Sequence, residues 1–317
     1  LSIFYNWPSD YGIYYSMGNL IDQDYRLYKE AFDTKGPAYF FFLKLIGSII
    51  GKGVWQSYMS LFITTLLYLI SLCFIINKFV RDDLKKIFLI ILSVASLNYQ
   101  DALSSIAIFQ SALCIFSFYF LINSIETRNI YSYVFSTNLL SIAIFTRVDA
   151  IIYTPVFFII FIIFIRNYKS KLKLILLLSF SNLLLILFLL NFYSISIIEF
   201  YEANIDHYGK FAVPSNIKTK LYILIYRVDQ IIELFLQGII PSFILVFGIL
   251  FFNKFFKNKK FNNHKYTLYL VLLGFMFSIY SESPSYRHAN IFVTPILFFI
   301  IYSLENIKIK NKYVLLL

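Results

Sequence analysis

The chain has 317 residues, of which 59% are hydrophobic and 14% charged, and its formal net charge is +11. Soluble globular proteins have roughly a quarter of their residues charged, so this composition excludes that class. It predicts an all-α, polytopic integral membrane protein, because several apolar runs reach the roughly 20 residues that cross a bilayer. Segments that alternate over about ten residues, as in an outer-membrane barrel, are not visible in the sequence.

Residues 1–53 come first and are expected to form an outer loop with a juxtamembrane helix. Acidic, basic and tyrosine side chains gather between Asp10 and Pro37. Pro37 suits the first turn of the helix that follows, where its missing N–H does no harm. Lys44 interrupts this apolar run, so we expect the helix to lie along the membrane interface rather than to cross the membrane.

Residues 54–317 form the second expected domain, a transmembrane helical domain with an outer loop at 193–229. Its nine predicted spans lie at about 54–77, 87–100, 102–123, 131–146, 151–165, 174–192, 230–252, 266–280 and 291–306. Two short spans predict a hairpin with Arg147 and Asp149 at its tip. Both chain ends fall within apolar stretches, so we expect the chain to be part of a longer protein.

Lysine and arginine counts orient these spans, because basic residues favour cytoplasmic loops. One set of loops holds 17 of the 28 basic residues and, with Glu305 at the end of the last predicted span counted, has a net charge of +13, whereas the other side has a net charge of −2. The basic loops are 78–86, 124–130, 166–173, 253–265 and 307–313. We therefore expect 1–53, 193–229 and 281–290 to face outward. The residue usage, rich in Ile, Phe, Asn and Lys, favours a bacterial cytoplasmic membrane.

The outward location limits the chemistry of these loops, since neither ATP nor nucleotide sugars are available there. The sequence contains no Gly-x4-Gly-Lys-Ser/Thr loop and no Gly-x-Gly-x-x-Gly fingerprint. A lipid-phosphate-linked sugar fits the charges, because its phosphate can leave without a general acid but needs cations to hold it. Lys35, Arg147 and Arg287 lie at predicted outer membrane ends. An acceptor hydroxyl needs a base, for which Asp10 and Asp33 are the candidates.

No cofactor is indicated, and a divalent metal, although compatible with this chemistry, has no evident ligand set. Asp22-Gln23-Asp24 matches the Asp-x-Asp pattern of soluble transferases, but the triplet is common by chance and lies on the outer side. Cys73 and Cys114 both lie in apolar runs, as small buried hydrophobic residues do. The positive net charge belongs to the cytoplasmic loops, so no nucleic-acid partner is expected.

Two runs in the first outer loop carry a family resemblance. Ser9-Asp10-Tyr11 and the run from Tyr28 to Tyr39, with Asp33-Thr34-Lys35-Gly36-Pro37 at its centre, resemble the first outer loop of polyprenyl-phosphate-sugar-dependent glycosyltransferases of the GT-C class. That class includes protein O-mannosyltransferases, aminoarabinose transferases of lipid A and bacterial relatives. The resemblance implies that Asp10 is the catalytic base and that Asp33 and Lys35 bind substrate. The family often has Asp-Glu where this chain has Asp10-Tyr11.

Three further elements are similar to bacterial members of this class and occur in the same order. They are Phe145 to Asp149 at the hairpin tip, Asn204 to Tyr208 in the later outer loop, and Tyr286-Arg287-His288 followed by Pro295. The resemblance implies that substrate is bound by Arg147, Asp149, Tyr208, Arg287 and His288. The glutamate that the family usually has near the third span is missing, and this region contains Asp101, Ser104, Ser105 and Gln110 instead.

The predicted reaction is transfer of a sugar from a polyprenyl-phosphate donor to an envelope glycan, lipid or protein, in one inverting step at the outer face. Membrane lipids are the other expected partners. A lipid-linked polysaccharide polymerase is the alternative within glycan chemistry. A transporter or flippase is the alternative from another class, although no internal repeat with broken helices is visible.

Each candidate residue also has a purely structural interpretation. Aspartates such as Asp10 and Asp33 commonly cap helices or lie in solvated loops. Lys35 can be an interfacial lysine whose charged end reaches water, and Arg147 can form a structural ion pair with Asp149. Loop residues Arg287 and His288 can simply be solvated. The tyrosines at positions 11, 14, 15, 25 and 28 fit an interfacial aromatic belt.

Overall fold

The computed structural model describes residues 26–29, 35–81, 83, 85–87, 89–90, 105–155, 157–158, 161–162 and 171–203. Most of these residues are helical, and no β-strand occurs among them. Three described helices are long and apolar enough to cross a membrane, by their length and composition: residues 55–79, 106–127 and 172–192. The predicted helical class is confirmed for this part of the chain. The spans predicted at 230–252, 266–280 and 291–306 lie outside it.

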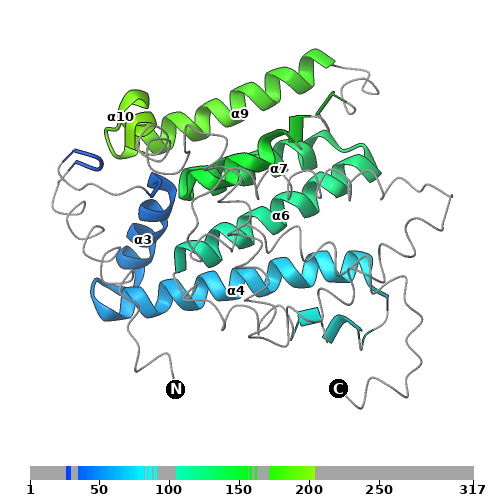
Figure 1. Cartoon of the computed structure of the whole chain (residues 1–317), viewed down its shortest axis with the longest axis horizontal. Helices are drawn as coiled ribbons and strands as arrows, with labels where there is room; N and C mark the ends of the chain where they lie inside the picture. The colour runs from blue at the N-terminus through cyan, green and yellow to red at the C-terminus, as the bar shows by residue number, and fades with distance from the viewer. Residues whose placement is uncertain are drawn as a thin grey trace, which may run out of the picture.

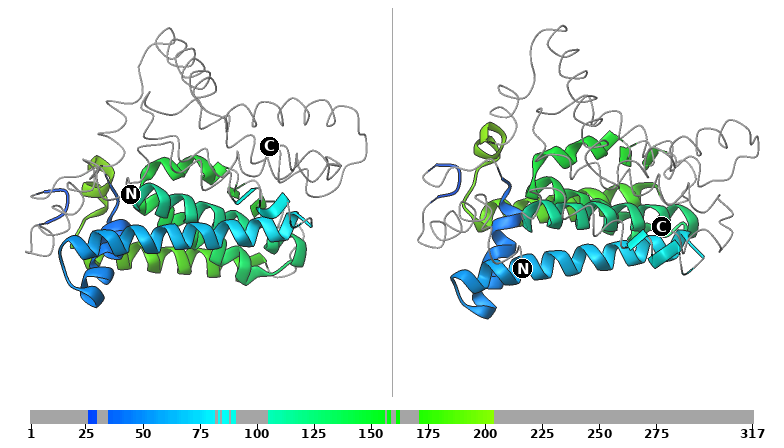
Figure 2. Two further views of the ribbon diagram at one scale, coloured as in Figure 1. Left: turned by 90° about the horizontal axis from the view of Figure 1, so that it is seen from below. Right: turned by 60° about the horizontal axis from the view of Figure 1, so that its bottom comes forward.

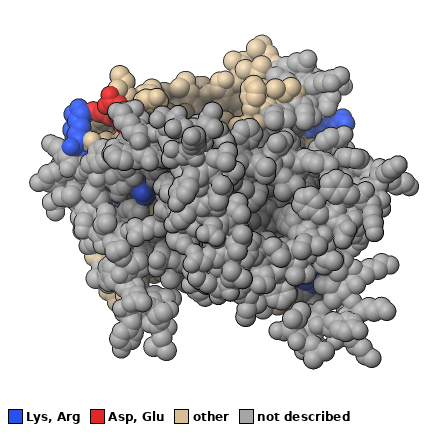
Figure 3. Space-filling model, in the orientation of Figure 1, with Lys and Arg blue, Asp and Glu red and all other residues tan. Residues whose placement is uncertain are grey.

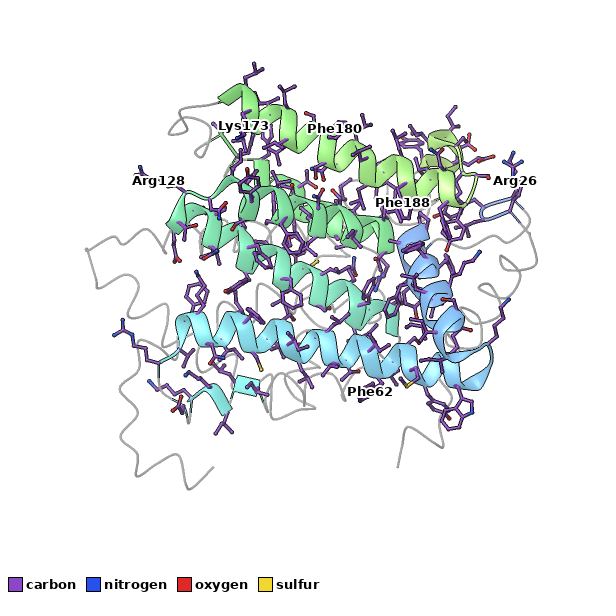
Figure 4. All side chains as sticks on the ribbon, turned by 180° about the vertical axis from the view of Figure 1, so that it is seen from behind. Arg26, Phe62, Arg128, Lys173, Phe180 and Phe188 are labelled. Atoms are coloured by element: carbon purple, nitrogen blue, oxygen red, sulfur yellow. The ribbon has the colours of Figure 1, made fainter. Side chains whose placement is uncertain are left out.

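The long helices pack side by side in one row (Figure 1). Their order is α4 (Val54–Phe79), α6 (Ser105–Thr127), α7 (Ile130–Thr146) and α9 (Lys171–Phe192). α6 is the most buried of the three candidate spans and α9 the least. Large apolar side chains along α9, such as Phe180 and Phe188, are exposed (Figure 4). An exposed apolar stripe of this kind suits a helix that borders lipid.

Two serines join α6 to α7. The Ser117 hydroxyl donates to the Ser136 carbonyl oxygen at 2.8 Å, and the Ser136 hydroxyl donates to the Ser117 carbonyl oxygen at 2.6 Å. Small residues let two helix backbones approach closely, and each hydroxyl here is satisfied by the neighbouring helix. The connection between the two helices is short. It passes through Arg128 with φ 54° and Asn129, whose side chain accepts a hydrogen bond from the Tyr131 N–H at 2.9 Å.

A polar seam joins α7 to α9, and it consists of Thr137, Asn138 and Ser141 facing Ser181 and Asn182. Asn138 donates to Ser181, and the Ser141 hydroxyl donates to Asn182 Oδ1 at 2.7 Å. Asn182 Nδ2 donates to Thr137 Oγ1 at 3.3 Å. Side-chain hydrogen bonds between apolar helices stabilise their association. The seam therefore fixes α7 and α9 in the same direction and at one relative height.

α3 (Pro37–Ile50) crosses one end of this row and contacts α4, α7 and α9 (Figure 2). Phe42 stacks on Phe109 in the first turns of α6, with 4.5 Å between ring centroids. Phe41 packs edge-on against Phe192 in the last turn of α9, with 4.9 Å between ring centroids. We call this the α3 end of the row, which comprises the starts of α4 and α6 and the ends of α7 and α9.

Two glycines turn the chain from α3 into α4. Gly51 has φ 94° and Gly53 has φ 112°, values that side chains with a Cβ rarely adopt. The buried Gln56 side chain then donates to the Leu43 carbonyl oxygen at 2.7 Å, which ties α4 back to α3. The crossing angle of α3 is therefore fixed by backbone conformation and by a buried hydrogen bond.

The opposite end of the row carries charged residues at helix ends. Lys78 Nζ lies 2.6 Å from Glu126 Oε2 and donates to Asn123 Oδ1 at 3.3 Å, so α4 and α6 end at the same level. Arg128 and Lys173 lie at this end, away from Arg26 at the α3 end (Figure 4).

Candidate functional site

Of the eight candidate residues, Lys35 and Arg147 are described with their side chains, and Asp149 with its backbone only. Asp149 lies in η1 (Val148–Tyr153), the 3-10 helix that follows α7. Five candidates lie outside the described residues: Asp10, Asp33, Tyr208, Arg287 and His288. The N-cap of α3 is Gly36, and the capping alternative for Asp33 stays untested because Asp33 lies outside the described residues.

The segment Lys35–Pro37 meets the end of α7 directly. The Gly36 N–H donates to the Thr146 carbonyl oxygen at 2.9 Å, which satisfies one of the carbonyl groups that a helix end leaves without an internal partner. A Cβ on Gly36 would overlap with the carbonyl oxygen of Phe145, so only glycine allows this approach. We call this contact the Gly36–Thr146 junction. Because Lys35 precedes Gly36 and Arg147 follows Thr146, the junction brings together two cations that are far apart in the sequence.

Arg147 lies at the tip of a helical hairpin, as the sequence predicted. Its extended backbone, with φ −148° and ψ 130°, ends α7 and starts η1. The chain then returns along α7, because the Tyr133 hydroxyl donates to the Phe157 carbonyl oxygen at 3.0 Å. Buried Gln110 of α6 donates to the Arg147 carbonyl oxygen at 3.0 Å. This bond fixes the tip against a second helix.

The Arg147 side chain is buried, with 6% of the residue exposed. Taking a guanidinium out of water is unfavourable unless acceptors or a counter-charge surround it. A fixed cation in such surroundings also interacts more strongly with an anion than a solvated cation does. Arg147 is therefore suited to hold a negatively charged group, either of the protein or of a substrate.

An aromatic contact connects the segment at Tyr28 to α10 (Ile197–Tyr201) and to the hairpin tip. Tyr28 has φ 73°, is buried, and donates from its hydroxyl to the Lys35 carbonyl oxygen at 2.9 Å. Its ring meets Phe200 edge-on at 6.3 Å, and Phe200 stacks on Phe145 at 4.6 Å. Tyr28 therefore packs in the interior, whereas the sequence had placed it in an interfacial belt.

A group of charges joins the same two segments. Glu199 of α10 lies 2.6 Å from Lys29 Nζ and 3.7 Å from Arg26, which also donates to the Ser194 carbonyl oxygen at 3.3 Å. The Lys29 hydrogen bond, helped by the Ser196 N–H, lowers the pKa of Glu199 to about 2. Figure 3 shows basic and acidic side chains together on the edge of the described surface near α10.

Sequence reasoning missed the contribution of α10. A local signal was present, because Ser196-Ile197-Ile198-Glu199 has the spacing of a capping box. The structure contains that box: the Glu199 N–H donates to the Ser196 hydroxyl, and Glu199 Oε2 accepts from the Ser196 N–H. The pattern predicts a helix start. It does not indicate that the next residue, Phe200, packs against Phe145.

The α3 end therefore combines the buried Arg147, the adjoining backbone of Lys35 and Gly36, and three packed aromatic rings from three chain segments. Such an arrangement can hold an anionic group next to apolar surface. Glu199 is a poor general base, because a carboxylate with a pKa near 2 has little affinity for a proton at neutral pH. In the described part of the chain, no three His, Cys, Asp or Glu side chains come together as a metal site.

No family model, curated protein or solved structure matches the chain. The functional argument therefore rests on the residues at the α3 end. Those residues are Lys35 and Arg147, which flank the Gly36–Thr146 junction, and the rings of Tyr28, Phe145 and Phe200, which pack on one another.

Proposed function

We propose that the protein is a membrane glycosyltransferase of GT-C type, with about nine spans, that works on the outer face of a bacterial cytoplasmic membrane. It transfers a sugar from a polyprenyl-phosphate donor to a glycan, lipid or protein of the cell envelope. The α3 end is the outer end in this proposal, because the described basic loops lie at the opposite end.

The observation that carries the proposal is the Gly36–Thr146 junction. Two elements that resemble separate parts of GT-C transferases, Lys35-Gly36-Pro37 and the tip at Arg147, meet through one backbone hydrogen bond of 2.9 Å. They are more than a hundred residues apart in the sequence. A polar junction of two cations at the end of apolar helices suits a lipid-linked phosphate, whose charge lies at the membrane surface and whose chain enters the bilayer.

In the proposed reaction Asp10 accepts the proton of the acceptor hydroxyl. The hydroxyl oxygen forms a bond to the anomeric carbon, and the bond from that carbon to the phosphate oxygen breaks. The polyprenyl phosphate leaves with the bonding electrons, and its new negative charge is stabilised by Lys35 and Arg147. Single displacement inverts the anomeric centre. Further substrate contacts are assigned to Asp33, Asp149, Tyr208, Arg287 and His288.

The test is transfer of labelled sugar by membranes that contain the full chain, supplied with a panel of synthetic polyprenyl-phosphate sugars. We expect Asp10→Asn to lower kcat by about 10²-fold or more, because it removes the general base. We expect Lys35→Gln to lower kcat/KM by about 10²-fold, because it removes a cation that stabilises the leaving phosphate. Lys52→Gln is the matched control, since Lys52 is exposed in the turn after α3 and away from the junction.

Three results would contradict the proposal. Transfer at the wild-type rate by Asp10→Asn would exclude Asp10 as the base. Movement of labelled donor across vesicles that contain purified protein, without formation of a glycosidic bond, would favour the transporter alternative. Chain extension of a lipid-linked glycan, in place of single transfers, would favour the polymerase alternative.

A further inference from the structure

We propose that Phe200 of α10 is a positioning residue that holds Lys35 and Arg147 in place to bind the donor phosphate. This inference rests on the proposed function and adds a role for the second outer loop. Phe200 is half-buried and belongs to a five-residue helix. Its role is argued from the two rings that it contacts.

The Phe200 ring contacts Phe145 in the last turn of α7 and Tyr28, whose hydroxyl is bonded to the segment Lys35–Pro37. It stacks on Phe145, with ring centroids 4.6 Å apart and planes inclined by 22°. Phe145 is two residues before Arg147 and provides the carbonyl oxygen against which Gly36 packs. On the other side Phe200 meets the Tyr28 ring, whose hydroxyl holds the Lys35 carbonyl oxygen at 2.9 Å. One ring therefore restrains both cation-bearing segments.

α10 itself is held in place independently of that ring. A helix of five residues is not stable in isolation. Glu199 satisfies N–H groups at its start through the capping box and pairs with Lys29 across the surface. Ser194, with φ 51°, turns the chain out of α9, and the Ile195 N–H donates to the Leu190 carbonyl oxygen at 2.9 Å. These contacts fix the orientation in which Phe200 is presented.

Loss of the ring should therefore loosen the hairpin tip without unfolding α10. An aromatic pair contributes about 0.5–1.5 kcal/mol beyond its buried area, which is enough to change local opening by up to about 10-fold. Displacement of a binding group by about 1 Å can lower a rate by up to about 10²-fold. We therefore expect a larger effect on turnover than on the amount of folded protein.

The kinetic test compares three variants of the full chain in membranes. Phe200→Leu keeps an apolar side chain but removes the ring, and we expect kcat for the polyprenyl-phosphate sugar to fall about 10-fold. Phe200→Tyr keeps the ring and should restore turnover to within about 2-fold. Tyr201→Leu is the matched control, because Tyr201 is the exposed neighbour in the same helix, and its kcat should not change.

A second readout does not depend on turnover. Val148 is half-buried beside Arg147, so Val148→Cys reports access to the hairpin tip through its rate of labelling with a membrane-impermeant maleimide. Mass spectrometry separates this site from Cys73 and Cys114. We expect Phe200→Leu to raise the labelling rate at position 148 about 10-fold and Tyr201→Leu to leave it unchanged.

The two readouts separate this inference from the proposed function. Lower kcat together with faster labelling in Phe200→Leu supports both. Wild-type kcat and wild-type labelling in Phe200→Leu overturn the positioning role while the glycosyltransferase stands. Faster labelling in a protein whose wild type transfers no sugar overturns the proposed function and still supports control of the hairpin tip by Phe200.

Discussion

The two ends of the helix row are built by different kinds of contact. At the opposite end, Lys78 and Glu126 pair at helix ends, and Arg128 occupies an exposed turn. At the α3 end, a backbone hydrogen bond, a glycine without room for a Cβ and stacked rings bring distant segments together. Charge alone is enough to place the first end at a membrane surface. The second end has the specific geometry that binding and catalysis need.

This comparison predicts its largest effect at Gly36. Gly36→Ala places a methyl group against the Phe145 carbonyl oxygen, so α3 must move away from α7. We expect the free energy of unfolding to fall by about 3 kcal/mol, which is measured as a lower melting temperature in detergent. We also expect sugar transfer to be lost. Gly51→Ala is the control: its surroundings are open, but its φ of 94° makes a Cβ strained, so the expected loss is about 1 kcal/mol. Equal stability of the two variants would contradict the junction.

The next largest effect is expected when one arginine at each end of the row is replaced and the two variants are compared. Arg147→Gln removes a buried cation, so we expect a loss of about 2 kcal/mol in stability and of about 10²-fold in kcat/KM. Arg128→Gln removes an exposed cation and should change stability by less than about 0.5 kcal/mol, with no effect on transfer. Thermal unfolding and donor turnover measured on both variants test the difference. Similar losses for both would mean that burial of Arg147 has no functional consequence.

A smaller effect is expected from the two ion pairs of equal length. Lys78–Glu126 and Lys29–Glu199 both have 2.6 Å between nitrogen and oxygen. Each pair is partly exposed to solvent, with side-chain exposures of 16% and 35% in the first pair and 49% and 16% in the second. Water screens both pairs, so double-mutant cycles with glutamine replacements should give a coupling free energy of about 1 kcal/mol or less for each. A coupling above about 2 kcal/mol for either pair would contradict this prediction.

The smallest effect is a pH dependence at the α3 end. The pKa of Glu199 is lowered from 4.5 to about 2, so the folded state favours the charged carboxylate. The contribution of Glu199 to stability is therefore complete above pH 4.5 and is lost as the pH falls toward 2. Glu199→Gln should flatten the dependence of the melting temperature on pH within this window and leave it unchanged above. An unchanged slope below pH 4.5 would contradict the ion pair with Lys29.

Much of the helical framework could be predicted from local pattern. The span predicted at 54–77 is α4 at Val54–Phe79, and the span predicted at 174–192 lies within α9 at Lys171–Phe192. The parallel directions of α4 and α6, and of α7 and α9, agree with the alternation of predicted spans. Apolar length is a property of each segment, so it is visible in the sequence. Direction follows from the order of the segments along the chain.

The candidate site was predictable only in part. Lys35 and Arg147 could be selected because they are cations at predicted outer membrane ends, where the phosphate of a lipid-linked sugar would lie. Their approach through Gly36 and Thr146 could not be derived, since it depends on the position of α3 across the row. Phe200 had no signal of its own, because one aromatic residue among many apolar neighbours looks like any membrane-facing side chain. Contacts between distant segments are properties of the fold and are not present in local periodicity.

The reciprocal serine bonds between α6 and α7 have a consequence for how the protein is made. α6 and α7 are consecutive in the chain, joined by a turn of a few residues, and fastened to each other by Ser117 and Ser136. Contacts between neighbouring segments form fastest, because little loop entropy opposes them. This pair can therefore enter the lipid as one preassembled hairpin during synthesis. Later segments are then added to a unit that already presents the Arg147 tip at its far end.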